Sequence, residues 1–282
     1  MSKTKKLNKI TKKLSPKKAP VRKKTAVKRS RKPARWKELT AAGCVLLVLL
    51  VMGVVLLLRN PGYKTETGAV VPPGARAFCI DISHHNGEKI IWDSLKVMTD
   101  RDGRTVRSIG NATQIRPVGA VYMKASEGES MRDRRFRSNW EEAGKRGIRR
   151  GAYHFFSPAR NPVKQADNFI RVVGELRHAD LPPVLDIEKL PSGVSKDELN
   201  GNALVWLRLI ERHYGKKPVV YAPDSFIRDL LSKELKEAYP LWVAHYEVDA
   251  PLFKDYRMWQ FTDKAVIFGI PGFTDLSIIR NQ

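Results

Sequence analysis

The sequence has 282 residues, a mass of 32.0 kDa and a net charge of +23, and 42% of its residues are hydrophobic. This apolar content allows a globular core and excludes a fully disordered chain. The charge is concentrated at the N-terminus, where residues 1–37 contain 17 Lys and Arg and no acid. Residues 38–282 carry 35 basic and 29 acidic side chains, a net charge of only +6. The high charge therefore says little about what a folded domain binds.

Residues 1–40 are of low complexity and rich in Lys, Arg, Pro and Ser, which predicts a disordered basic tail on the cytoplasmic side. Such a tail is expected to attract anionic lipid head groups. Nucleic acid is the less favoured partner, because the tail has a single aromatic residue, Trp36, and no binding motif.

Residues 41–58 form an uncharged apolar run of 18 residues. As a helix it would be about 27 Å long, close to the hydrocarbon thickness of roughly 30 Å, and it has no polar face. This predicts a single transmembrane helix. A cleaved signal peptide is the alternative, but its apolar region is usually about 7–15 residues and ends at small residues. The basic N-terminal flank predicts an inner-membrane protein with its N-terminus inside and its main domain outside.

Beyond the apolar run, residues 59–76 are rich in Gly, Pro and Thr and are expected to form a linker. Residues 77–282 then have the length of one domain. Cys44 and Cys79 fall in different segments, so the sequence predicts no internal disulfide. The sequence contains no Cys/His cluster of the kind that would predict a metal site.

Residues 77–282 alternate short apolar segments with helical patterns, which favours a parallel sheet with right-handed crossovers. Eight strands are expected, at 77–82, 119–125, 151–156, 183–188, 218–222, 241–245, 257–261 and 266–269. Helices follow only the first five strands, the first of them at 92–97. The predicted fold class is therefore α/β, a modified TIM-type barrel with about five helices. Polar residues 98–118 are expected to form an inserted loop or hairpin that turns near Asp102 and Gly103.

Acidic residues occur where the predicted strands end, which is where parallel barrels place reacting groups. Asp81 closes the first strand, Asp186 and Glu188 close the fourth, and Asp275 follows the last. Because side chains alternate along a strand, the carboxyls of Asp186 and Glu188 should face the same side. Two carboxyls in a barrel mouth repel each other and lose solvation, so one should keep its proton, as a general acid must. The alternative is a pair of solvated acids bound to loop amides.

Aromatic and polar side chains gather at the same strand ends. Aromatic faces pack on sugar rings, and amides and carboxylates bind their hydroxyl and acetamido groups, so their shared position favours a carbohydrate cleft. The sequence has neither a Gly-rich phosphate loop nor a serine nucleophile elbow. The residues in question are Tyr153, His154, Phe155, Tyr221, Trp242, His245, Tyr246, Trp259 and Gln260.

Seven motifs in order, spanning about residues 78–277, resemble the glycoside hydrolase family 25 lysozymes, or N-acetylmuramidases. They are DISHHNG at 81–87, KASEG at 124–128, GAYHFF at 151–156, LDIE at 185–188, LWVAHY at 241–246, WQF at 259–261 and Asp275. The resemblance implies a modified TIM barrel of eight strands. It also implies cleavage of the β-1,4 bond between N-acetylmuramic acid and N-acetylglucosamine in peptidoglycan, without a metal or organic cofactor.

The resemblance further implies roles for individual residues. Glu188 is similar to the general acid, and Asp186 to a partner carboxylate that acts as a nucleophile or orients the 2-acetamido group of the substrate. Asp81 and Asp275 resemble supporting acids. The expected substrate-binding residues are Tyr153, His154, Phe155, Lys124, Glu127, Tyr221, Trp242, His245, Trp259 and Gln260.

One position departs from the family pattern, because Ser277 stands where an Asn is expected after Asp275. Two alternative functions stay open at this point: a barrel that binds glycan without cutting it, and a glycosidase acting on chitin-like amino sugars. The retention of four acids disfavours the first alternative, since a pure binder has no need for mutually repelling carboxylates.

Overall fold

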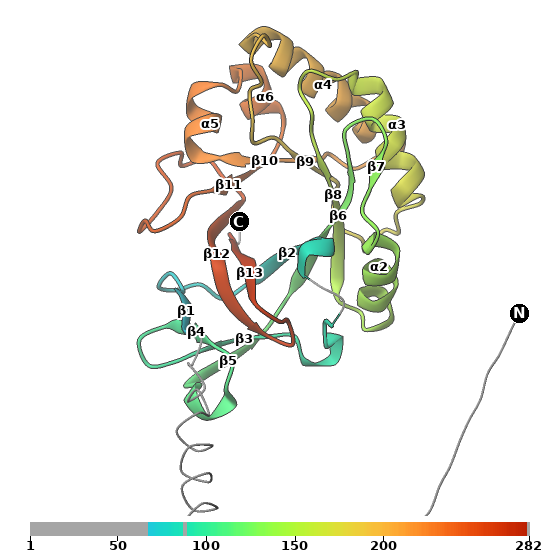
Figure 1. The fold of residues 1–282 in the computed structure, drawn as a ribbon. Helices are drawn as coiled ribbons and strands as arrows, with labels where there is room; N and C mark the ends of the chain where they lie inside the picture. Colours follow the sequence, from blue (N-terminus) through green and yellow to red (C-terminus); the bar gives the residue numbers. More distant parts are fainter. Residues whose placement is uncertain (1–66, 87–88, 281–282) are drawn as a thin grey trace, which may run out of the picture. The chain divides into compact units, whose positions relative to one another are not determined.

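The computed structural model describes residues 67–86 and 89–280 of the chain (Figure 1). The basic tail and the apolar run at 41–58 lie outside these residues, so the predicted membrane helix is not part of the description. Among the helices that are described, none is long and apolar enough to span a bilayer.

Eight strands form a closed barrel, as predicted. Each of the first seven runs parallel to its neighbour, and the eighth is antiparallel to both the seventh and the first, which closes the ring. The strands are β2 (Phe78–Ile82), β6 (Ala120–Glu127), β8 (Arg149–Phe155), β9 (Val184–Asp186), β10 (Val219–Pro223), β11 (Leu241–Ala244), β12 (Met258–Phe268) and β13 (Phe273–Ile279).

The eighth strand is not the expected one. The segment 266–269, predicted as a separate strand, is mostly the far end of β12, and β13 closes the barrel instead. Asp263 and Lys264 have the polarity of a turn, but they are exposed residues of a continuous strand whose register shifts between Gln260 and Ala265. This irregularity carries β12 past the end of β11 without interrupting the strand.

Five α-helices follow the strands from β6 to β10, and side-chain oxygens cap the N-terminal ends of three of them. The Asn161 side chain accepts hydrogen bonds from the amides of Val163 and Lys164, and that of Ser195 accepts one from the amide of Glu198. The helices are α2 (Phe136–Lys145), α3 (Pro162–Val173), α4 (Lys196–Tyr214), α5 (Asp224–Asp229) and α6 (Lys233–Ala238).

The helix predicted at 92–97 is wrong. A 3-10 turn at Trp92–Ser94 leads directly into β3 (Lys96–Thr99), because Val97 and Met98 are buried in a second, smaller sheet. In this sheet β3 pairs with the far end of β12, with β4 (Arg104–Val106) and with β5 (Gln114–Pro117). Tertiary pairing thus overrides a short local pattern.

The inserted segment forms the expected hairpin between β3 and β4. Gly103, at φ 77°, completes its turn, and the carboxylate of Asp100 accepts hydrogen bonds from the amides of Asp102 and Arg104. β1 (Thr67–Val70) lies within the segment expected to be a linker and pairs with β4. The small sheet lies beside the barrel, next to the β12–β13 hairpin (Figure 1).

Inside the barrel, the aromatic ring of Tyr122 on β6 lies over Gly151 on β8, its direct cross-strand partner. A Cβ at Gly151 would lie only 2.1 Å from Cε1 of Tyr122. This distance is well inside van der Waals contact, so the tyrosine ring or the backbone would have to move. The glycine of the GAYHFF segment is therefore required by packing in the barrel interior.

We predict that G151A lowers the free energy of unfolding by about 1–3 kcal/mol, because the added methyl overpacks the barrel interior. G201A is the matched control: Gly201 is exposed on α4 with open space around it, so alanine should stabilise the protein by about 1 kcal/mol. Urea denaturation of both variants tests this. If G151A were as stable as the wild type, the contact with Tyr122 would not constrain position 151.

Candidate active site

The ends of the barrel strands surround a cavity of about 280 Å³. Acidic, aromatic and amide side chains share this cavity, as predicted. The lining residues are Asp81, Ser83, His85, Lys124, Tyr153, Phe155, Val184, Asp186, Glu188, Tyr221, Trp242, Tyr246, Gln260 and Asp275.

The carboxyls of Asp186 and Glu188 both line this cavity, while Leu185 and Ile187, which alternate with them along the chain, are fully buried in the hydrophobic core. Asp186 is buried at 8% exposure, and its Oδ1 has no hydrogen-bond partner in the described part of the chain. Glu188 is exposed at the cavity mouth. The alternation expected from the sequence is thus present, with one deep and one accessible carboxyl.

The environment raises the pKa of both acids. Burial, followed by the charge of Glu188, raises the pKa of Asp186 well above its ordinary value, and the Lys124 ammonium partly opposes this. Partial desolvation raises the pKa of Glu188, again against nearby lysines. At a given pH, both groups therefore hold a proton more readily than they would in water.

Asp81 and Asp275 form a second acidic pair. They are register partners on β2 and β13, because the antiparallel β13 starts at the edge where the parallel strands end. Burial and then the neighbouring Asp275 raise the pKa of Asp81 well above its ordinary value, and burial raises that of Asp275 to about 6. The sequence predicted that Asp275 follows the last strand, but the residue lies within β13.

Gln260 links this acidic pair to the aromatic wall. Its Nε2 donates to both carboxylate oxygens of Asp81, at 3.1 Å each. Its Oε1 accepts from the hydroxyls of Tyr221, at 2.8 Å, and Tyr246. Because the Gln260 oxygen already accepts from two hydroxyls, only the NH2 group of this amide faces Asp81. An NH2 donor favours the ionised carboxylate of Asp81, which can accept with both oxygens.

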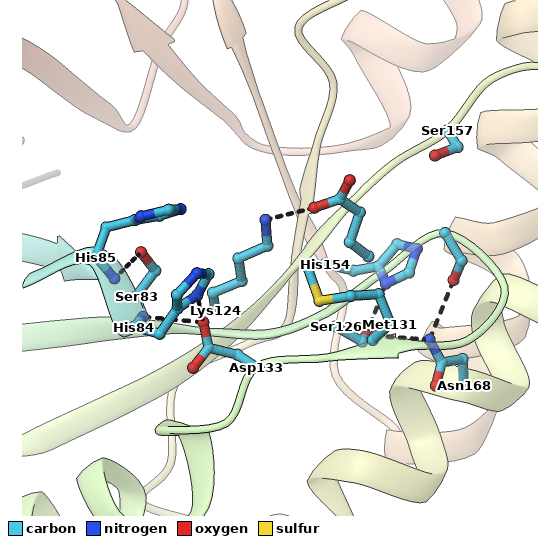
Figure 2. A network of polar contacts seen from close by, with 12 residues as sticks. Ser83, His84, His85, Lys124, Ser126, Met131, Asp133, His154, Ser157 and Asn168 are labelled. Atoms are coloured by element: carbon cyan, nitrogen blue, oxygen red, sulfur yellow. Dashed lines mark hydrogen bonds and ion pairs between the residues drawn. The ribbon is translucent and has the colours of Figure 1, made fainter.

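Another wall is built from β2, β6 and β8. The Lys124 ammonium lies 4.8 Å from the ring centroid of Phe155 and donates to Oε2 of Glu127 at 2.6 Å. Figure 2 shows the adjacent segment, where Nδ1 of His84 lies 2.7 Å from Oδ2 of Asp133. This contact holds the turn that carries His85 to the cavity.

Four predicted substrate-binding residues lie outside this cavity. His154 is fully buried, and its Nδ1 lies 2.8 Å from Oγ of Ser126 (Figure 2). Its Nε2 lies 3.2 Å from Oε1 of Gln165, and burial lowers the pKa of His154 to about 3, so it is a neutral core residue. Trp259 is 3% exposed and donates to the carbonyl of His245. The side chains of His154 on β8 and Trp259 on β12 thus point away from the cavity, whereas those of their neighbours Tyr153 and Gln260 line it.

The other two are Glu127 and His245. Glu127 reaches the cavity only through Lys124. His245 lines a neighbouring recess of about 450 Å³, with its Nδ1 3.6 Å from Oδ1 of Asp224. These residues can position others, but they do not line the central cavity.

The sequence reasoning missed three lining residues: Ser83, His85 and Val184. The first two belong to the DISHHNG motif, whose turn after Asp81 was a usable signal. Ser277, which departs from the family pattern, is buried, and its Oγ accepts a hydrogen bond from Nε1 of Trp242 at 2.9 Å. Within the described residues, no three His, Cys, Asp or Glu side chains are arranged to hold a metal ion.

Clustered acids, aromatic rings and amides at the strand ends of an eight-stranded barrel define a glycoside hydrolase. Comparison with known families agrees: the profile of glycosyl hydrolases family 25 matches residues 80–270, and the chain belongs to this family.

Relatives and solved structures extend this assignment. The Escherichia coli K12 protein YegX is 32% identical over 212 residues, which cover 74% of this chain and 72% of that protein. Lysozyme M1 of Streptomyces globisporus is 31% identical over 70% of this chain and 65% of its own. The bacterial lysozyme of Streptomyces coelicolor superposes with a TM-score of 0.61 at 28% identity, covering 74% of this chain and 94% of that one.

The Asp275 carboxyl should make stability depend on pH. Its pKa is raised from 3.8 to about 6 on folding, so the folded state binds the extra proton between these values. Its contribution is therefore greatest below pH 4 and is lost as the pH rises through about 6. Asparagine does not titrate, so we predict that the stability of D275N relative to wild type increases from pH 4 to pH 7.

Urea denaturation at unit pH intervals measures this difference. D255N, which changes an exposed acid, is the control and should show a constant offset. A constant offset for D275N as well would contradict a raised pKa at this position.

Proposed function

We propose that this family 25 glycoside hydrolase cleaves the β-1,4 bond between N-acetylmuramic acid and N-acetylglucosamine in peptidoglycan. The observation that carries the proposal is the pair Asp186 and Glu188, which enter one aromatic-lined cavity from the end of a single strand. The relatives named lysozyme, and a solved autolysin from Streptococcus pneumoniae in complex with a synthetic peptidoglycan ligand, support this choice of substrate.

Glu188 acts as the general acid in this proposal. It is accessible to a glycosidic oxygen, and its raised pKa keeps a larger fraction of the carboxyl protonated near neutral pH. Proton donation to the leaving oxygen allows the C1–O bond to break without forming a free alkoxide. The same carboxylate then removes a proton from the attacking water.

Asp186 is the partner carboxylate. Its buried Oδ1 has no partner among the described residues and is free to meet either the anomeric carbon or the acetamido N–H of the substrate. The first contact makes Asp186 the nucleophile, and the second makes it the group that orients the acetamido oxygen for attack. The positive charge of Lys124 favours the ionised form that both roles need.

We predict that E188Q lowers the rate of peptidoglycan hydrolysis by about 10²–10⁴-fold, because the amide cannot donate the proton. The matched control is E237Q, an exposed glutamate on α6, which should retain wild-type activity. Release of new reducing ends from purified sacculi by the full-length protein measures the rate. Mass spectrometry of the products identifies the reducing sugar.

Full activity of E188Q would disprove the role of this residue. Saturable binding without new reducing ends would favour the glycan-binding alternative. Equal cleavage of chitin oligomers would instead favour a broader amino-sugar glycosidase.

We also propose that residues 41–58 anchor the enzyme in the cytoplasmic membrane with the barrel outside, and that the basic tail contacts anionic lipids on the inner side. The length, apolarity and basic N-terminal flank of this segment support the proposal. The anchor would keep the enzyme near the cell wall.

We predict that the full-length protein stays in the membrane fraction after alkaline carbonate washing, whereas a variant lacking residues 41–58 does not. Protease added outside spheroplasts should digest the barrel and leave the tail intact. A mature N-terminus after residue 58, found by mass spectrometry, would show instead that the segment is a cleaved signal peptide.

A further inference from the structure

A second cavity of about 680 Å³ adjoins the catalytic one, and the two share Tyr246 as a common wall. It lies between the small sheet and the β12–β13 hairpin. Its walls come from residues 68–70, 72–73 and Arg104 on one side, and from residues 246–249, 261–264 and Phe273 on the other. A substrate that extends beyond the catalytic cavity past Tyr246 would therefore enter this space.

The wall made by β1 is firmly built. β1 pairs with β4, and the amide of Val71 donates to the carbonyl of Gly103 at 2.9 Å. Gly68 fits so tightly that a Cβ there would lie 2.1 Å from Oγ1 of Thr105. Residues 68–73 and Phe273 also lie outside the range 80–270 matched by the family profile, so this cavity is not simply a part of the shared barrel.

The cavity combines exposed apolar side chains with charges of both signs. Val70, Val248 and Phe273 are 47%, 37% and 52% exposed. Its basic residues are Arg104 and Lys264, and its acidic residues are Glu247, Asp249 and Asp263. Of these, Lys264 and Glu247 form a loose ion pair at 3.7 Å, while Arg104 has no ion pair within the described chain.

This mixture fits a peptide better than a sugar chain. A glycan strand is uncharged apart from its substituents and is bound mainly by aromatic faces and hydroxyl partners. The peptide stem of peptidoglycan carries carboxylates, an amine and alanine methyl groups close together. Charges of both signs beside apolar side chains are complementary to those groups.

We infer that this second cavity binds the peptide stem attached to the glycan and makes the enzyme prefer stem-bearing strands. The inference rests on the proposed muramidase function and specifies the substrate form that this site selects. Arg104 receives a stem carboxylate, and the acids on the opposite wall receive the amine. Glu247 has a backbone φ of 56°, and no other non-glycine residue in the described part of the chain has a positive φ. Such strained backbone conformations cluster at functional sites, which supports a functional role for this loop.

The test compares kcat/KM of the full-length protein on soluble glycan strands with stems and on the same strands after an amidase has removed the stems. We expect the wild type to prefer stem-bearing strands by about tenfold. R104E should reduce this ratio to less than about threefold through a higher KM, because it repels the stem carboxylate. R101E is the matched control, since Arg101 is an exposed residue of the same hairpin outside the cavity, and it should keep the wild-type ratio.

Equal cleavage of both substrates by the wild type would overturn the inference while leaving the muramidase function standing. A ratio for R104E equal to that of R101E would overturn it as well. Cleavage of neither substrate would overturn both the inference and the proposed function. If R104E does not fold, D263K on the opposite wall replaces it, and an unchanged ratio in that variant counts equally against stem binding.

Discussion

Burial of carboxyl groups at one end of the barrel is the constraint on which the site depends. Asp81, Asp186 and Asp275 lose most of their hydration there, and their pKa values rise because the charged form is penalised. At neutral pH this arrangement opposes folding, so it must be held by the rest of the barrel. The result is a set of acids that keep their protons to a higher pH than free carboxyls do.

The barrel opposes this cost with neutral hydrogen-bonding groups and with the charges of Lys124 and Lys189. Gln260 donates to Asp81 and is itself fixed by two tyrosine hydroxyls, so the acid receives hydrogen bonds without a counter-ion. Lys124 acts on Asp186 and Glu188 from a distance and is paired directly with Glu127. A cation in direct contact would stabilise the carboxylates more and remove the raised proton affinity that a general acid needs.

Much of this arrangement could be predicted from the sequence, because period-2 alternation places Asp186 and Glu188 on one face. His154 and Trp259 obey the same alternation, but the sequence alone does not say which of two adjacent residues at a strand end faces the interior. His154 alternates with Tyr153 and Phe155, and only the observed register shows that Tyr153 and Phe155 face inward. The 92–97 segment was mispredicted because its partner, the far end of β12, lies about 170 residues away in the chain.

The antiparallel direction of β13 explains why a barrel with few late helices still completes its site. A parallel eighth strand would need a crossover to bring its carboxyl end to the site. An antiparallel strand needs only the short connection between β12 and β13, and its first residues already lie at the active edge, where Asp275 pairs in register with Asp81. The same hairpin extends beyond the barrel and pairs with the small sheet, so the closure of the barrel also builds one wall of the second cavity. One hairpin thereby places both Asp275 and a wall of the second cavity.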